Sequence, residues 1–157
     1  MPVILRAIFL ILPLVFSAWG PAAASSTASD RLLTSGKRAL AGADYDRAVL
    51  LFEQSMTANP KNASAYGYLA KSYQEMGETK LARKYVDLAL EVDPDNVTAL
   101  EQAVRLDLAD NSFDAAGLRL ERLERVCAGA VCPDMQALQA TLRLAKDGGD
   151  EGPTSAE

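Results

Sequence analysis

Three basic residues recur at equal intervals: Lys71 follows Lys37 by the same number of positions as Arg105 follows Lys71. In a stacked repeat, side chains one period apart come to lie side by side. The three cations would then form a basic column that could bind the carboxylates of an acidic peptide segment or chain terminus. The alternative is that they are ordinary solvated surface charges, paired with acids such as Glu75 or Glu101.

Catalytic chemistry has few candidates. The chain contains no histidine, so it has no Ser–His or Cys–His pair and no imidazole general base. Paired acids such as Asp44 and Asp46 flank turns, where Asp is favoured for local hydrogen bonds. Residues 110–112 lack the glycine and downstream ligands of a calcium loop, and residues 34–37 lack the flanking residues of a phosphate-binding loop. We therefore expect no enzyme activity, no catalytic residue, no metal site and no cofactor.

The chain has two cysteines, Cys127 and Cys132. In an oxidising compartment such a close pair is expected to form a local disulfide. Closing so short a loop would stabilise the fold by about 2 kcal/mol in the chain-entropy model. Most redox dithiols have a different spacing, and a zinc site needs about four ligands. A pair that cycles between dithiol and disulfide is the alternative, and it is the chain's one candidate for redox chemistry.

The N-terminal segment has the layout of a secretory signal peptide. Arg6 ends a short basic region, residues 7–19 are apolar, and three alanines end at Ala24. A transmembrane anchor is the alternative, but a spanning helix needs roughly 20 apolar residues, and this run is shorter and contains Pro13. We expect residues 1–24 to be cleaved, leaving a periplasmic or secreted protein without stable membrane insertion.

The expected mature chain is acidic. Arg6 is the one charged residue in the first 24, so 16 basic residues become 15 against 21 acidic ones, a net charge of −6. Nonspecific binding of phosphate backbones needs clustered Lys and Arg. Nucleic acid is therefore excluded as the expected partner.

Apolar residues recur at helical spacing in seven segments. Asn62 and Asn96 are placed as N-caps, while Gly77 is placed to end a helix in a left-handed conformation. The predicted helices cover about 30–40, 45–58, 63–76, 79–92, 97–109, 113–126 and 133–146.

Two of these segments close on the same motif, Asn59-Pro60 and Asp93-Pro94, at a spacing of about 34 residues. In that frame the chain resembles the tetratricopeptide repeat family. The middle repeat, residues 63–96, carries the family's pattern at Tyr66, Leu69, Ala70, Tyr73, Gly77, Ala82, Val86, Ala89 and Pro94. A first repeat over about 29–62 keeps Leu32, Gly36, Tyr45, Ala48, Phe52 and Pro60, and a third over about 97–130 keeps Leu100, Phe113, Ala116 and Leu120. The third departs from the pattern at Ala103, Asp107 and Leu123.

The resemblance implies an all-α, right-handed α-solenoid of three helix hairpins, closed by a C-terminal capping helix at 133–146. The repeat domain would cover residues 30–146. A flexible leader at 25–29 would precede it, and a disordered acidic tail at 147–157 would follow.

The resemblance also implies a concave groove, lined by the first helices of the repeats, that grips an extended peptide or a partner helix. The partner-binding candidates in this groove are Lys37, Lys71, Arg105, Leu33, Gly67 and Gln74. Gly67 would leave a notch for a ligand's backbone, or would only relieve helix crowding. Chaperone-binding members carry a Lys/Asn clamp, which Leu33, Tyr68, Thr98 and Gln102 do not reproduce here.

These features together predict a non-catalytic interaction protein. It would be an adaptor or assembly factor that binds a protein or peptide partner, possibly an acidic one, in the groove. The alternative is a self-associating scaffold of the cell envelope, in which the third repeat and the cysteine-bearing cap form a homotypic interface.

Overall fold

A computed structural model describes residues 22–128, 132 and 134–149, and within these ranges every regular element is a helix. The helices are α1 (Ala22–Ala41), α2 (Tyr45–Ala58), α3 (Ala63–Glu75), α4 (Thr79–Val92), α5 (Val97–Ala109), α6 (Phe113–Val126) and α7 (Met135–Gly149). The all-α prediction is confirmed. Most of the expected signal segment, residues 1–21, and the part of the expected tail from 150 onward lie outside the described residues.

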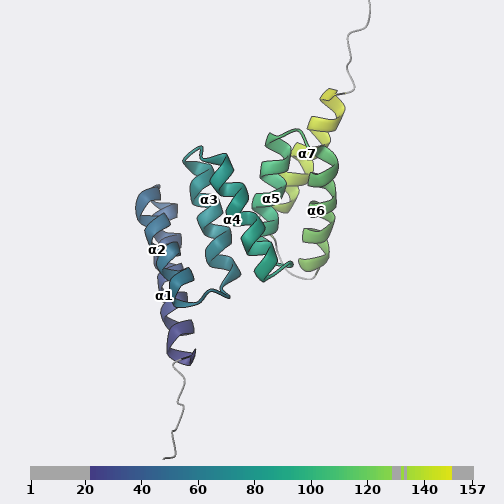
Figure 1. Cartoon of the computed structure of the whole chain (residues 1–157). Helices are drawn as coiled ribbons and strands as arrows, with labels where there is room; N and C mark the ends of the chain where they lie inside the picture. Colours follow the sequence, from purple (N-terminus) through teal and green to yellow (C-terminus); the bar gives the residue numbers. More distant parts are fainter. Residues whose placement is uncertain (1–21, 129–131, 133, 150–157) are drawn as a thin grey trace, which may run out of the picture.

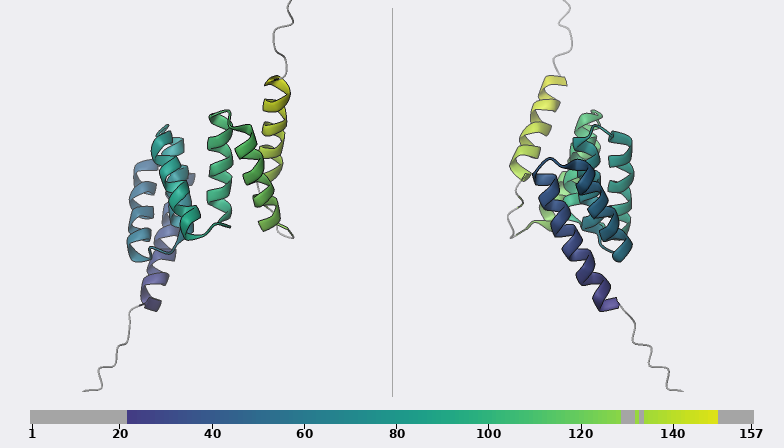
Figure 2. Two further views of the ribbon diagram at one scale, coloured as in Figure 1. Left: turned by 45° about the vertical axis from the view of Figure 1, so that its right-hand side comes forward. Right: turned by 90° about the vertical axis from the view of Figure 1, so that its left-hand side faces the viewer.

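The helices form a row of hairpins in chain order. Each hairpin consists of two helices that are consecutive in the chain: α1 with α2, α3 with α4, and α5 with α6. Each hairpin also contacts the next one (Figure 1). Helix α7 packs on both α5 and α6, and Figure 2 shows it at the end of the row opposite α1. Helix α7 therefore caps a solenoid of three hairpins, as the sequence predicts. No helix among the described residues is both long and apolar enough to cross a bilayer.

The three hairpin turns repeat one backbone conformation. Ala43, Gly77 and Asn111, which hold equivalent positions in the three turns, have φ angles of 56°, 79° and 56°. At the middle turn the Glu78 amide donates to the Tyr73 carbonyl at 2.8 Å, the long bond of a left-handed helix terminus. The prediction for Gly77 is confirmed, while Ala43 adopts the same conformation despite its Cβ atom.

The predicted N-caps are also confirmed. The Asn62 side chain accepts from the Ala65 amide at 3.3 Å, and the Asn96 side chain accepts from the Ala99 amide at 3.1 Å. Each asparagine follows a proline turn, where the preceding helix cannot continue. These caps fix where the first helix of the second and third hairpins begins.

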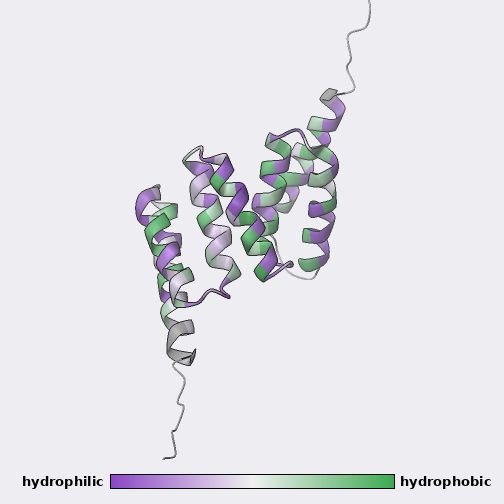
Figure 3. Ribbon diagram, in the orientation of Figure 1, coloured by the Kyte–Doolittle hydropathy of each residue, from purple (hydrophilic) through white to green (hydrophobic). Residues whose placement is uncertain are grey.

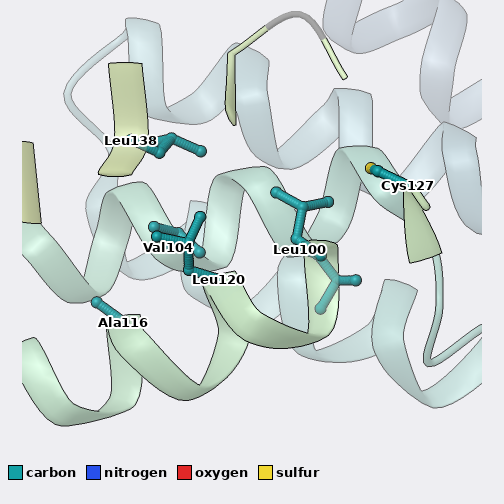
Figure 4. Packing of buried hydrophobic residues seen from close by; sticks show 7 residues of the cluster. Leu100, Val104, Ala116, Leu120, Cys127 and Leu138 are labelled. Atoms are coloured by element: carbon teal, nitrogen blue, oxygen red, sulfur yellow. The ribbon is translucent and has the colours of Figure 1, made fainter. Parts of the chain in front are cut away.

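Small residues let the helices approach closely. Ala48, Ala82 and Ala116 are fully buried at equivalent positions of α2, α4 and α6. Apolar and polar residues alternate around each helix (Figure 3), so every hairpin buries one side against its neighbours. At the C-terminal end, Leu100 and Val104 of α5 pack with Leu120 of α6 and Leu138 of α7 (Figure 4).

The prediction of a flexible leader at residues 25–29 is wrong, because α1 already includes these residues. Ser29 is fully buried and exchanges hydrogen bonds of 2.9 Å with Ser55 of α2: each hydroxyl donates to the other residue's carbonyl. The Asn62 amide nitrogen also donates to the Ser29 hydroxyl at 2.9 Å. These bonds join the start of the first hairpin to its end. At the other end of the row, α7 continues past the predicted boundary at 146 to Gly149.

Candidate functional site

The first helices of the hairpins bring the predicted basic column together in part. Lys37 of α1 and Lys71 of α3 line one hollow of about 370 Å³. The lining also includes Leu40 of α1, Tyr68 of α3 and Glu75 at the end of α3. The hollow therefore combines two cations, two aromatic rings (Tyr45 and Tyr68) and one carboxylate.

Lys37 is held over an aromatic ring. Its Nζ atom lies 4.8 Å from the centroid of the Tyr68 ring, within the range of a cation–π interaction. Tyr68 in turn stacks on the buried ring of Phe52, with centroids 5.7 Å apart. The ammonium group is thus positioned at the hollow without a carboxylate partner among the ion pairs of the described residues.

Lys71 interacts electrostatically with an acid on α5, the first helix of the next hairpin. Glu101 of α5 has its pKa raised by burial and by the charge of Asp134, while the charges of Arg105 and Lys71 pull it down in part. Lys71 makes no ion pair within 4.0 Å in the described part of the chain. The positive charge of Lys71 therefore acts both on Glu101 and on any ligand bound in the hollow.

Arg105 is already paired. Its Nη2 atom donates to Oδ2 of Asp134, immediately before α7, and both side chains are about one-third to two-fifths exposed. The third position of the basic column is thus neutralised by the protein's own carboxylate. The three equivalent cations have three different environments: an aromatic face, a more distant acid and a direct ion pair.

The remaining groove candidates lie mostly inside the solenoid. Leu33 packs against the buried cluster of Ala48, Phe52 and Leu69. Gly67 is buried, and a Cβ atom there would lie 3.2 Å from the Ala99 amide nitrogen of α5. The structure contradicts the expected notch at Gly67, because α5 occupies that space. The glycine instead allows α3 and α5 to approach each other closely.

Gln74 is half-buried on α3, and its Oε1 atom is enclosed without a hydrogen-bond partner among the described residues. Its Nε2 atom likewise donates no hydrogen bond to another described residue. Gln74 therefore contributes a half-buried amide beside the groove and no further polar interaction within the described chain.

The two cysteines lie together between α6 and α7. Their Cα atoms are 6.1 Å apart, which suits a disulfide, and the structure joins them. Cys127 is buried in the cluster that α5, α6 and α7 share. A bridge here would tie α7 to the third hairpin, and its formation in the protein stays a prediction.

The described residues hold no cluster of three or more Cys, Asp or Glu side chains placed to bind a metal ion. Tyr73 and Tyr85, stacked at 5.5 Å, have raised pKa values because they are partly buried and lie near the charge of Glu53. These shifts follow from helix packing.

Sequence reasoning named Glu101 as a possible partner of the cations but missed Tyr68 and Asp134, which meet Lys37 and Arg105. Asp134 follows Arg105 by 29 positions, and Tyr68 and Glu101 follow Lys37 and Lys71 at nearly the same interval. Each of the three stands on, or directly before, the next first helix in the row. Their shared interval is slightly shorter than the repeat period, so a search at that period alone does not detect them.

A family model of tetratricopeptide repeats matches residues 39–104. The heat-shock protein cognate co-chaperone sgt12 of Aspergillus fumigatus is 31% identical over 91 residues, which is 57% of this chain. The match spans 27% of the length of that co-chaperone.

Solved structures share the fold at lower identity. The tetratricopeptide domain of Sgt2 from Aspergillus fumigatus has a TM-score of 0.71 at 21% identity, with 82% of this chain and 85% of that one covered. The first such domain of Spaghetti (RPAP3), bound to the HSP90 peptide SRMEEVD, has a TM-score of 0.69 at 19% identity, with 78% and 96% covered. The repeat model, the sequence period and the stacked hairpins agree that residues 39–104 consist of tetratricopeptide repeats.

Proposed function

We propose that this protein is a non-catalytic interaction module that binds an acidic peptide segment in the hollow between α1 and α3. The observation that supports this most directly is the convergence of Lys37 and Lys71 on one hollow beside Tyr68. Neither lysine makes an ion pair within 4.0 Å in the described chain, and Glu75 is the one carboxylate in the lining. The resulting net positive charge favours an anionic ligand, since each charge-assisted hydrogen bond contributes about 1.5–3 kcal/mol. An adaptor or assembly factor is the role that fits such a module.

The related structures are consistent with this proposal at a coarse level. Relatives of this fold have been solved with HSP90 and HSP70 peptides, and SRMEEVD contains two glutamates and an aspartate. Those ligands belong to those proteins. What carries over to this chain is the expectation of a protein or peptide partner, and the acidic character rests on Lys37 and Lys71.

We also propose that the protein acts outside the cytoplasm, in the periplasm or as a secreted protein. The arrangement of Arg6, the apolar run at 7–19 and the small residues before Ser25 supports export. N-terminal sequencing of the protein recovered from cells tests this. A mature chain that starts at Ser25 is expected, and an intact Met1 on a cytoplasmic protein would contradict it.

Charge reversal in the hollow tests the binding proposal. The double variant K37E/K71E should weaken binding of a fluorescent acidic peptide by more than about tenfold, the factor for one lost charge-assisted hydrogen bond. The matched control K61E/K80E makes the same change in net charge at two exposed lysines outside the hollow. Equal weakening by both variants would show that net charge, not the hollow, attracts the peptide.

The same variants separate the adaptor from a self-associating scaffold. The adaptor loses partner capture from the envelope fraction in K37E/K71E while its oligomeric state, measured by light scattering, stays unchanged. A scaffold would lose self-association when the third hairpin or α7 is altered, and would be indifferent to K37E/K71E.

A further inference from the structure

The basic column differs from one end to the other, because its cations are progressively neutralised by the protein itself. Lys37 meets the face of Tyr68, Lys71 shares its field with Glu101, and Arg105 is ion-paired with Asp134. Two carboxylates, Glu101 of α5 and Asp134 before α7, therefore lie near Arg105, while the α1–α3 end has two lysines without an ion pair in the described chain and one carboxylate, Glu75. This asymmetry has consequences for which ligands the groove accepts.

We propose that Asp134 is a specificity-determining residue. It forms an ion pair with Arg105, the third cation of the column, and so confines a ligand's acidic residues to the α1–α3 end. The inference rests on the proposed function, since it concerns the same groove. It assigns a polarity to the partner: an acidic end over Lys37 and Lys71, and a neutral or basic continuation over Glu101 and Asp134.

The geometry sets the length of the acidic end. Adjacent first helices in such a stack are about 8–10 Å apart, so Lys37 and Arg105 are separated by roughly two such steps. An extended peptide covers about 3.3 Å per residue and reaches from one end of the column to the other in roughly six residues. Acidic residues beyond the first three or so would meet Glu101 and Asp134, and the repulsion would cancel what the added charge gains.

The pairing of Arg105 and Asp134 is one of several contacts between α7 and the third hairpin. Helix α7 is also fixed by Leu138, which is 2% exposed in the apolar cluster shared with α5 and α6. Gln139 of α7 donates to Glu124 of α6 as well. Removing the Asp134 charge should therefore free Arg105 while α7 remains in place.

Two peptides of about ten residues, a span sufficient for the whole column, test the inference. One begins with a run of glutamates and continues with glutamines, and the other is glutamate throughout. Their affinities are measured by fluorescence anisotropy for the wild-type protein, D134N, D134E and the control D114N. Asp114 is an exposed acid on α6 whose removal changes the net charge equally.

In the wild type, the all-glutamate peptide should bind no more tightly than the half-acidic one despite its larger charge. In D134N it should gain about tenfold, the factor for one charge-assisted hydrogen bond to Arg105, while the half-acidic peptide changes less than about twofold. D134E should restore the wild-type preference. Far-ultraviolet circular dichroism of D134N confirms that α7 is still folded.

The outcomes separate the inference from the function that it rests on. Equal gains for both peptides in D134N and D114N would reduce the effect to net charge and overturn the inference. Wild-type binding that K37E/K71E abolishes but D134N leaves unchanged would also overturn it, while the proposed function stands. If neither peptide binds the wild type or D134N, both the function and the inference are lost.

Discussion

Arg83 Nη1 of α4 lies 3.1 Å from Oδ1 of Asp107 of α5, so a buried carboxylate joins the second hairpin to the third. The Asp107 side chain is only 4% exposed, and its Oδ2 atom lies 3.1 Å from Nε of Arg119 on α6. Arg83 reaches Asp110 as well. Burial lowers the pKa of Arg83, but its hydrogen bonds to Asp107 and Asp110 and the charges of these two aspartates together raise it by more, so the net pKa is raised. Asp107 occupies the position that Tyr73 holds in the second repeat.

Neutralising this carboxylate should destabilise the fold. D107N removes one charge from a buried site and leaves two arginines facing an amide that cannot pair with both. Breaking a buried ion pair from one side costs about 3–5 kcal/mol, and the one-third exposure of the arginines reduces the expected loss to about 2 kcal/mol. Urea denaturation at neutral pH measures the free energy of unfolding.

The matched control is D95N. Asp95 pairs with Arg122 at 2.9 Å, but the two side chains are 63% and 44% exposed. An exposed pair contributes less than about 1 kcal/mol. Equal losses of unfolding free energy in D107N and D95N would show that burial of Asp107 does not strengthen its contribution to stability.

Much of the fold was predictable because turn chemistry and helical period agree in this chain. Asn62 and Asn96 mark two helix starts, and Pro60 and Pro94 mark the ends of the preceding hairpins. The start of α1 was not predictable in the same way. Ser29 belongs to a small, polar stretch that resembles a linker, and its burial depends on Ser55, 26 residues away.

The site was predictable in register but not in detail. The repeat period places Lys37 and Lys71 at equivalent positions of α1 and α3, and stacking of these two helices brings both lysines to one hollow. Their role in partner binding stays a prediction. It could not show that Arg105 pairs with Asp134, because that contact crosses the cysteine-bearing connection where the period breaks. Gly67 was ambiguous because a glycine can face either solvent or a neighbouring helix.

Adding one methyl group at Gly36 should be destabilising. A Cβ atom there would lie 2.5 Å from Cε1 of Phe52, whose ring is fully buried and cannot move aside freely. Overpacking of this kind costs about 1–3 kcal/mol, more than the roughly 1 kcal/mol that alanine gains over glycine within a helix. Thermal unfolding of G36A should show a lower midpoint temperature.

The control for G36A is the same substitution at Gly117 of α6. A Cβ atom there would meet only Cδ2 of Leu142, at 3.9 Å, an ordinary contact. G117A should therefore raise stability by about 0.5–1 kcal/mol. A stabilised G36A would mean that Phe52 has room that the structure does not provide.

Reduction should loosen the C-terminal end of the solenoid. If Cys127 and Cys132 are bridged in the protein, adding dithiothreitol removes about 2 kcal/mol of stability, the value for so short a loop in the chain-entropy model. Amide exchange should then rise first in α7, because the bridge ties it to α6. The C132S variant, which cannot form the bridge, should not respond to the reductant. Two free thiols titrated in the native, unreduced protein would refute the pairing.

Replacing Glu101 by glutamine should stabilise the protein at neutral pH. The folded protein raises the pKa of Glu101 through burial and Asp134, so the ionised carboxylate costs stability. The contribution of Glu101 is therefore most favourable below its unfolded pKa and is lost as the pH rises through the higher folded value. E101Q should exceed the wild type by up to about 1 kcal/mol near pH 7, and the difference should vanish towards pH 4. Urea denaturation at both pH values measures this, with the exposed Glu91 changed to glutamine as a control. A less stable E101Q at neutral pH would mean that attraction to Lys71 and Arg105 outweighs the burial of the charge.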